Sequence, residues 1–523
     1  MDFLIHHMLL TSAERFPNKE VLADAKQRLT YEEFAGQTQS LSRAFRETGI
    51  QRGDRIGVWL EPSVAQAVSI FGTAQAGAVF VPINILLFPD QVAHIVRDCQ
   101  IKALVTTQSK MVTLASVRQT LPSLDFVVAT DREAELFFDL AVYSFQAFCG
   151  GPGSDSGNAA PIEKDLAAIL YTSGSTGKPK GVMLSHAQIM AGSSIVSNYL
   201  SITSEDRILG VLPLSFDAGL NQLMTAVQQG GTFVPMSFVF AKEIVQLLLK
   251  ERITGMGGVP TLWSLLAQPS STLEKHSLPN LRYISNTGGR MPQSVLASLR
   301  RMLPTTKIFL MYGLTEAFRS TYLPPEELDR RPDSMGKAIP NTEILVVTDK
   351  GEPCKPGQVG ELVHRGPTVS MGYWGQPELT ARVLRPHPFL PPELGDNERV
   401  CYSGDLVKTD EAGFLYFVGR RDNMIKSSGY RVSPTEVEET LFQSGYLREA
   451  GVIGIPDPVL GQVIKAFVVP RDGEIVKADA LIAFCAERLP RYMVPKVVEV
   501  VGPLPKTPSG KIDYPALRKR EGS

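Results

Sequence analysis

A polar, glycine-rich loop between two apolar stretches constrains this chain more than any other feature. The apolar stretch Leu166–Tyr171 predicts a buried strand, and Gly181–Leu184 predicts a second, short strand. The residues between them read TSGSTGKPK. Small residues let the backbone approach a polyphosphate closely, while the hydroxyl groups, free N–H groups and two lysines can bind phosphate oxygens. The loop therefore predicts a binding site for a nucleotide triphosphate.

This loop differs from a Walker P-loop, although both are rich in glycine. A P-loop has a glycine five positions before its Gly-Lys pair, and a serine or threonine directly after the lysine. Thr172 and Pro179 occupy those two positions here. Ser185 and Gln188 instead form a predicted capping box, which opens a helix after the second strand. The loop is therefore a phosphate site of another kind.

Length and composition indicate a large protein made of several subdomains. The chain has 523 residues, which is too long for a single hydrophobic core. The net charge of −1 argues against nucleic acid as a main partner. The 5 cysteines are scattered and lack the spacing of metal ligands. This pattern fits reduced thiols, and we expect a cytoplasmic protein.

The segment Pro62–Pro89 carries no charged residue and is long enough to cross a bilayer. Its glutamines, prolines and glycines favour another interpretation. We expect a buried helix to about Gly77, followed by a strand over Ala78–Ile83. The N-terminus has no basic region before an apolar core, so we expect neither a membrane span nor a secretion signal.

Turn-forming residues divide the rest of the chain. Gly150–Pro161 predicts a connector, and the alternating strand-like and helix-like segments around it predict parallel sheets covered by helices. Short, glycine-rich strands over Gly351–Tyr373 predict a small β-rich unit. After Gly419 the pattern predicts a separate α+β unit, with helices over Pro434–Gln443 and Asp479–Leu489 and strands over Val452–Ile455 and Lys465–Val469. The fold class is therefore α/β, with a mobile α+β lid at the C-terminal end.

Five motifs occur in order between residues 171 and 512. They are YTSGSTGKPKG at 171–181, YGLTE at 312–316, YSGD at 402–405, GRRDNMIKSSGYRV at 419–432 and PKTPSGKI at 505–512. This series resembles the adenylate-forming superfamily, which holds acyl- and aryl-CoA synthetases, adenylation domains of nonribosomal peptide synthetases, and luciferases. The resemblance implies an N-terminal AMP-binding domain over residues 1–421 and a C-terminal lid domain over residues 422–523.

The resemblance also implies a reaction. A free carboxylate is a poor electrophile, because its leaving group would be oxide. Attack of the carboxylate on the α-phosphate of ATP, with Mg²⁺ bound, would give an acyl-adenylate and release pyrophosphate. A phosphopantetheine thiol would then take the acyl group. Such a site must neutralise the triphosphate and stabilise charge on the α-phosphoryl group.

The resemblance assigns the nucleotide site to residues of four motifs. Thr315 would bond to the α-phosphate, and Glu316 would ligate Mg²⁺, a hard cation that prefers carboxylate oxygen. Tyr312 would stack on adenine, Asp405 would accept both ribose hydroxyls, and Arg420 would support the ribose and phosphates or form a structural ion pair. The β- and γ-phosphates would be held by Thr172, Ser173, Gly174, Ser175, Thr176, Gly177 and Lys178.

Three residues of the C-terminal motifs would serve the two half-reactions. Lys511 would bridge the substrate carboxylate and the α-phosphate oxygens, and is the third expected catalytic residue beside Thr315 and Glu316. In the resembling enzymes the lid rotates between the half-reactions about the position of Asp422, where a few residues absorb the rotation. Gly429 would line the thiol channel, where a side chain would obstruct the pantetheine arm.

The expected substrate is a small carboxylic acid, preferably an amino acid. Phe216 and Asp217 resemble the pair in peptide-synthetase adenylation domains whose aspartate binds the substrate ammonium group. Asp217 lies in an apolar context and would need a cationic partner, unless it caps the helix that begins near Ala218. Arg319 could bind a substrate carboxylate or pair with Glu326 or Glu327. By resemblance, the remaining pocket positions are Gly257, Ser285, Thr287, Met311 and Ser320.

No carrier domain is visible before the last residue, Ser523, so we expect the thiol acceptor to be CoA or a free-standing carrier protein. The main alternative is a fatty or aryl acyl-CoA synthetase. A luciferase-like oxidase would share every motif and would be recognised by light or oxygen uptake. A non-catalytic adenylate-binding protein would be expected to lack Lys511 or Glu316, and both are present.

Overall fold

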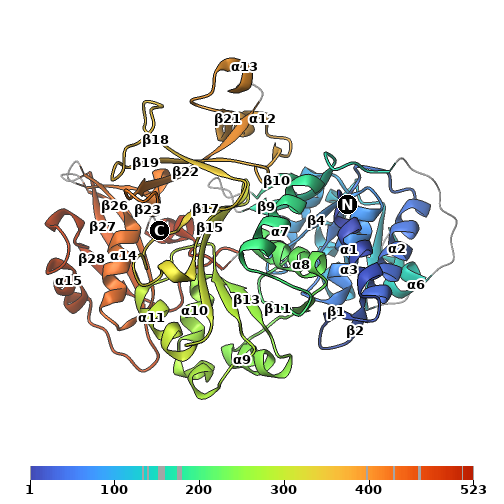
Figure 1. The fold of residues 1–523 in the computed structure, drawn as a ribbon, viewed down its shortest axis with the longest axis horizontal. Helices are drawn as coiled ribbons and strands as arrows, with labels where there is room; N and C mark the ends of the chain where they lie inside the picture. Colours follow the sequence, from blue (N-terminus) through green and yellow to red (C-terminus); the bar gives the residue numbers. More distant parts are fainter. Residues whose placement is uncertain are drawn as a thin grey trace.

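The strands of this computed structural model form four sheets within the described part of the chain (Figure 1). The structure describes residues 2–131, 135–137, 140–150, 160–172, 179–395, 398–427, 430–457, 461–508 and 510–521. Two of the sheets have 9 strands each, and the other two have 5. The expected α/β class is confirmed.

The first large sheet carries the hairpin that flanks the phosphate loop. Its central strands are parallel, and β9 and β10 pair antiparallel, with Thr172 opposite Lys180. Both predicted strands are therefore confirmed. The sheet consists of β3 (Arg55–Val58), β4 (Val79–Pro82), β5 (Ile101–Thr106), β6 (Phe126–Ala129), β7 (Glu135–Phe137), β8 (Leu140–Ser144), β9 (Leu166–Thr172), β10 (Lys180–Ser185) and β20 (Gly372–Tyr373).

The uncharged segment Pro62–Pro89 forms one of the N-terminal helices. That segment folds as helix α3 followed by strand β4, as predicted, because α3 is buried along nearly its whole length. Among the described residues, no helix combines the length and apolarity that crossing a membrane requires. The helices are α1 (Ile5–Arg15), α2 (Tyr31–Glu47), α3 (Val64–Gln75), α4 (Pro89–Asp98), α5 (Gln108–Leu114) and α6 (Phe145–Gly150).

The second large sheet is parallel at its centre and antiparallel at both ends. It consists of β1 (Glu20–Ala23), β2 (Arg28–Thr30), β11 (Arg207–Gly210), β12 (Thr232–Pro235), β13 (Gly255–Gly258), β14 (Tyr283–Asn286), β15 (Lys307–Leu314), β16 (Ala317–Leu323) and β17 (Lys337–Ala338). Its helices are α7 (His186–Tyr199), α8 (Asp217–Gln229), α9 (Ala241–Lys250), α10 (Pro260–Leu266) and α11 (Gln293–Met302).

Helices α7 and α8 pack against each other between the two large sheets (Figure 1). The predicted capping box opens α7: the Ser185 side chain accepts from the Gln188 backbone, and the Gln188 side chain accepts from the Ser185 backbone. A single apolar core contains Leu184 of the first sheet together with Phe233 and Phe318 of the second. The two sheets are therefore joined by one buried core.

The β-rich unit predicted over Gly351–Tyr373 is confirmed in part: β19 belongs to the third sheet, whose strand pairs are all antiparallel, but β20 pairs with β10 of the first sheet. The third sheet consists of β18 (Glu343–Val347), β19 (Gly360–Arg365), β21 (Leu384–Pro386), β22 (Arg399–Thr409) and β23 (Leu415–Arg420), with helices α12 (Pro377–Val383) and α13 (Pro392–Gly395). Strand β22 lies opposite β23 with Asp405 and Arg420 as direct partners.

The fourth sheet and its helices form the C-terminal unit. It consists of β24 (Ile425–Ser427), β25 (Tyr430–Val432), β26 (Leu447–Asp457), β27 (Gly461–Pro470) and β28 (Val497–Val500), with α14 (Pro434–Gln443), α15 (Ala478–Ala486) and α16 (Tyr514–Glu521). Helix α14 has the predicted bounds. Helix α15 ends before the predicted Leu489, because the residue preceding a proline is disfavoured in helical conformation and Pro490 follows. The boundary at residue 422 stays a prediction.

A buried carboxyl group in this unit gives a testable pH dependence. Glu438 of α14 accepts hydrogen bonds from the Tyr514 hydroxyl at 2.7 Å and the Val452 N–H at 2.8 Å. Burial raises the pKa of Glu438 from 4.5 to about 7. Because the raised pKa belongs to the folded state, the stabilising contribution of this group is full below about pH 4.5 and is lost as the pH rises through about 7.

We therefore expect Glu438→Gln to flatten the pH dependence of the C-terminal unit. In the wild type, local unfolding of α14 should become easier by about 3 kcal/mol between about pH 4.5 and pH 8. Hydrogen exchange of the α14 amides across this range measures the change. Glu436→Gln, at an exposed position of the same helix, is the matched control. An identical slope in the wild type and Glu438→Gln would show that this carboxyl does not titrate as described.

Candidate active site

Lys511 lies in a loop that docks against both large subdomains. The Asn84 side chain donates to the Pro508 carbonyl at 2.9 Å, and the Thr261 hydroxyl donates to the Gly510 carbonyl at 3.0 Å. The Lys511 Nζ atom lies 5.6 Å from the centre of the Phe216 ring. The C-terminal loop is therefore held with its lysine directed at the start of α8.

Carboxylates from three separate elements act electrostatically on this ammonium group. Burial lowers the pKa of Lys511, and Asp217, Asp405 and Glu316 act in the opposite direction, with Asp217 the strongest of the three. Residues that are far apart in sequence therefore share one electrostatic environment. Lys511 thus lies within electrostatic range of Glu316, Asp405 and Asp217, and the roles expected of these residues stay predictions.

Asp405 already has two partners in the structure. Its Oδ2 atom accepts from the Tyr312 hydroxyl at 2.6 Å, and its Oδ1 atom lies 2.9 Å from Arg420 Nε. Arg420 also donates to the Ser403 carbonyl at 3.3 Å. Burial, reinforced by Asp405, raises the pKa of Tyr312, so its hydroxyl stays protonated and donates. The predicted ion pair of Arg420 is thus present. Its partner is Asp405, the residue that is expected to bind the ribose hydroxyls.

Thr315 and Glu316 form the turn between β15 and β16, because Leu314 pairs directly with Ala317. Thr315 is buried, and the Glu316 carboxylate accepts from the Tyr373 hydroxyl at 2.5 Å. Tyr373 belongs to β20, which pairs with the hairpin strand β10. No sequence pattern pointed to Tyr373, which was noted only as the end of the β-rich stretch.

The donor set around Glu316 fits Mg²⁺. Mg²⁺ in nucleotide enzymes is held by one or two carboxylates together with substrate phosphates and water. Glu316 offers one carboxylate, and the described residues contain no group of three or more metal-ligating side chains that would form a complete protein cage. Glu316 would thus hold an ion that is completed by the phosphates of ATP, where the ion would neutralise phosphate charge.

Part of the expected site lies outside the described residues. Thr172 ends β9, but Ser173, Gly174, Ser175, Thr176, Gly177 and Lys178 are not described, and neither is Gly429. For Asp422 the structure gives only its place in a short 3-10 turn, Arg421–Asn423. The roles expected of these residues stay predictions.

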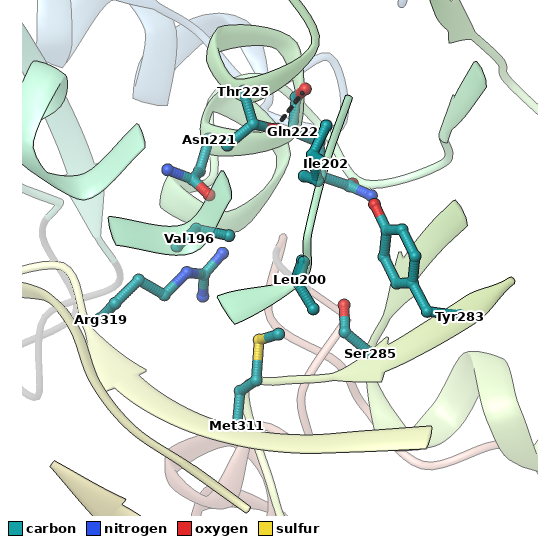
Figure 2. Close-up of a pocket in the computed structure, with 10 residues that line it drawn as sticks. All are labelled: Val196, Leu200, Ile202, Asn221, Gln222, Thr225, Tyr283, Ser285, Met311 and Arg319. Carbon is teal, nitrogen blue, oxygen red and sulfur yellow. Dashed lines mark hydrogen bonds between the residues drawn. The ribbon is translucent and has the colours of Figure 1, made fainter. Parts of the chain in front are cut away.

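A pocket beside the start of α8 contains three of the predicted substrate residues (Figure 2). Ser285, Met311 and Arg319 line it, together with Val196, Leu200, Ile202, Asn221, Gln222, Thr225 and Tyr283. Gly257 borders it, because a Cβ atom there would lie 3.0 Å from Gln222 Nε2 and 3.2 Å from Ser285 Oγ. Thr287 accepts from Arg319 Nη1 at 3.2 Å.

The sequence motifs do not indicate the α8 residues of this pocket. Asn221 lies four positions after Asp217, which places both on one face of the helix. Both are buried. Once Asp217 was singled out, helical periodicity could have indicated Asn221, so this signal was available.

Three alternatives from the sequence are corrected by the structure. Asp217 does not cap α8, because Phe216 occupies the N-cap position and Asp217 is the first helical residue. Arg319 does not pair with Glu327, which binds Arg331 at 2.5 Å, and no carboxylate in the described part of the chain forms an ion pair with Arg319. The Ser320 hydroxyl is not a pocket group, since it lies 2.9 Å from His364 Nδ1 in the core.

Close packing of the backbone explains why position 313 of the YGLTE motif is a glycine. A Cβ atom at this position would lie 3.0 Å from the Cα atom of Arg319. The missing side chain therefore lets the start of β16 fold back closely over β15. This close approach places Arg319 next to the pocket.

Comparison with known proteins places this geometry in a family. The AMP-binding enzyme pattern matches residues 9–374, and the AMP-binding enzyme C-terminal domain pattern matches residues 436–511. Feruloyl-CoA synthase of Amycolatopsis sp is 33% identical over 505 residues, which cover 94% of each chain. The long-chain-fatty-acid–CoA ligase of Bacillus subtilis (strain 168) is 29% identical and covers 99% of this chain and 93% of its own.

A solved structure gives the same result. The anthranilate CoA ligase AuaEII, in complex with anthranoyl-AMP, superposes with a TM-score of 0.90 at 25% identity, covering 99% of this chain and 97% of its own. The chain therefore belongs to the AMP-binding enzyme family and is an AMP-forming acid–thiol ligase.

Proposed function

We propose that this protein activates a short carboxylic acid with ATP and transfers the acyl group to the thiol of CoA. The observation that carries this proposal is the position of Lys511. Its ammonium group lies near Phe216 on the acid side and is influenced by Asp405 and Glu316 on the nucleotide side. A cation placed there can hold the attacking carboxylate and the α-phosphate together.

The two half-reactions follow from this arrangement. The carboxylate oxygen attacks the α-phosphorus, and pyrophosphate leaves with its bridging oxygen. Lys511 and Thr315 would stabilise the charge that builds up on the α-phosphoryl oxygens. The CoA thiolate then attacks the acyl carbon, and the C–O bond to AMP breaks. CoA ligases among the relatives and ATP-bound structural neighbours support CoA as acceptor and ATP as substrate.

We infer that the acid does not need an amine. The amino-acid hypothesis rested on the need of buried Asp217 for a cationic partner. Lys511 supplies a positive charge from within the protein, and Asp217 raises the pKa of this lysine more than Asp405 or Glu316 does. Feruloyl-CoA synthase and the fatty-acid ligase act, by their names, on acids that lack an amine. Asp217 then serves to position Lys511.

We infer that the acid is short. The aromatic ring of Tyr283 and the side chains of Leu200 and Met311 are buried and line the same pocket. These bulky groups leave little depth for a long alkyl chain. A fatty acyl tunnel would need an open path in their place, so we expect long-chain acids to be poor substrates.

Replacing Asp217 by asparagine tests its role. If Asp217 positions Lys511, adenylate formation should fall by about 10- to 100-fold for every acid, because a charge-assisted contact contributes about 1.5–3 kcal/mol. Pyrophosphate release with matched pairs, such as alanine and propionate, measures this. Thioester formation from pre-made adenylate should be unaffected. If adenylate formation fell only for the amino acids, Asp217 would instead bind the ammonium group of the substrate.

The acceptor is tested by supplying the activated acid with CoA or with a phosphopantetheinylated carrier protein. We expect acyl-CoA to accumulate in step with AMP, as seen by mass spectrometry. Acylation of the carrier protein with no acyl-CoA would show that the thiol comes from a protein. Light emission or oxygen uptake would identify the oxidase alternative.

A further inference from the structure

Arg319 is a buried cation that has no anionic partner in the described part of the chain. Only 4% of its surface is exposed. Its Nη1 atom donates to the neutral hydroxyl of Thr287, and its Nε atom has no hydrogen-bond partner among the described residues. Burying a charge is costly unless an opposite charge compensates it. Among the described residues, no carboxylate forms an ion pair with Arg319.

The guanidinium group is directed into the acid pocket. Figure 2 shows Arg319 reaching from β16 towards the space between α8 and β14, opposite Asn221. Its backbone has a φ of 74°, which a residue with a side chain rarely adopts. Strained backbone of this kind persists where a functional geometry requires it. The positive charge therefore faces the substrate.

Asn221 supplies a second donor in the same pocket. It is 1% exposed, and its Nδ2 atom also lacks a hydrogen-bond partner among the described residues. An unpaired buried donor carries a desolvation cost that a ligand acceptor would remove. A carboxylate has two acceptor oxygens, which suits a guanidinium group and an amide N–H together.

The anion site lies close to the reacting end of the substrate. Arg319 binds Thr287, and the next residue, Gly288, faces Lys511: a Cβ atom at Gly288 would lie 2.9 Å from Lys511 Cε. Adjacent Cα atoms are about 3.8 Å apart. Arg319 and Lys511 therefore contact consecutive residues of one segment, so both cations border the same part of the site.

We propose that Arg319 and Asn221 bind a second carboxylate of the acid, so that the preferred substrate is a short dicarboxylic acid. This inference rests on the proposed function, since it assigns the far end of the same substrate. Lys511 receives the carboxylate that is activated, and Arg319 receives the one that is retained. The retained carboxylate neutralises the buried guanidinium group when the substrate binds.

The test compares matched acids on the full-length protein. The panel contains malonate, succinate, glutarate and adipate, each paired with the straight-chain monoacid of equal length and with the corresponding ω-hydroxy acid. Pyrophosphate release reports activation, and calorimetry with the acid alone reports binding. We expect the best diacid to exceed its monoacid by at least about 100-fold in kcat/KM, because the monoacid leaves the guanidinium unpaired.

Arg319→Met should remove this preference, since methionine keeps an unbranched side chain without charge. Activation of the diacid should fall by at least about 100-fold, while activation of the monoacid should stay equal or rise. A cooperative thermal unfolding transition and unchanged binding of ATP show that the variant is folded. Arg319→Lys keeps the charge but loses the planar pair of N–H donors that binds a carboxylate. This variant should show an intermediate preference for the diacid over the monoacid.

The inference would be overturned by a monoacid or hydroxy acid preferred by the wild type, or by an equal loss on both acids in Arg319→Met. The proposed function fails in a different way. A diacid that binds in calorimetry through Arg319, but never releases pyrophosphate from ATP, would contradict the ligase activity and leave the anion site standing. Absence of binding and of turnover by every diacid would contradict the anion site.

Discussion

Replacing Lys511 by alanine should slow adenylate formation by about 10²–10³-fold, because one donor directed at transition-state charge typically contributes that much. Thioester formation from pre-made acyl-adenylate should be spared. In the structure the lysine lies beside Phe216 with Asp217, Asp405 and Glu316 around it, which is the arrangement that the first half-reaction needs. In the second half-reaction, rotation of the lid would carry Lys511 away from the acyl carbon.

The two half-reactions can be measured separately. Single-turnover formation of acyl-AMP reports the first, and acyl-CoA formation from synthetic acyl-AMP reports the second. Lys496→Ala, at an exposed position of the same unit, is the control for removing one lysine charge. An equal loss in both half-reactions would show that Lys511 does not act specifically in adenylate formation.

Replacing Asp422 by proline should have the opposite effect, sparing adenylate formation and blocking transfer. The residues on either side are tied to different units. Arg421 forms ion pairs with Asp349 at 2.8 Å and Glu361 at 3.2 Å in the third sheet, whereas Asn423 accepts from Arg518 of α16 at 2.8 Å. A pivot between these units would have to turn at Asp422, so the pattern supports the predicted hinge.

Proline fixes φ near −65°, which suits the 3-10 turn seen here and prevents the rotation. We expect adenylate formation within about threefold of the wild type and transfer reduced by more than about 100-fold, or about 2.7 kcal/mol. Asp422→Ala, which leaves φ unrestricted, is the matched control and should retain transfer. Normal transfer in Asp422→Pro would place the hinge elsewhere.

The sequence predicted the elements where one local pattern dominates. The bounds of α14, the strands β9 and β10, and the capping box of α7 all follow from periodicity or from a short polar signal. Strands β26 and β27 are longer than their apolar stretches, because cross-strand pairing continues as far as Asp457 and Gly461. Such pairing depends on a partner strand and cannot be seen in either segment alone.

The sequence motifs predicted which residues form the candidate site, but they did not predict which of these residues contact one another. The motifs indicated Asp217, Arg319 and Lys511, yet left the partner of each charge open. In the structure, long-range packing brings Lys511 within electrostatic range of Asp217 and leaves Arg319 in the pocket without a carboxylate partner among the described residues. Tyr373 reaches Glu316 only because β20 pairs with β10. No linear pattern contains that information.

The fate of oxygen from the substrate carboxylate tests the central claim most directly. A competent acid labelled with ¹⁸O in its reacting carboxylate is incubated with the protein, ATP, Mg²⁺ and CoA, and the products are analysed by mass spectrometry. If the carboxylate attacks the α-phosphorus and CoA later displaces AMP, one labelled oxygen must appear in AMP and none in pyrophosphate. Unlabelled AMP, or ADP and phosphate as the nucleotide products, would contradict an acyl-adenylate mechanism.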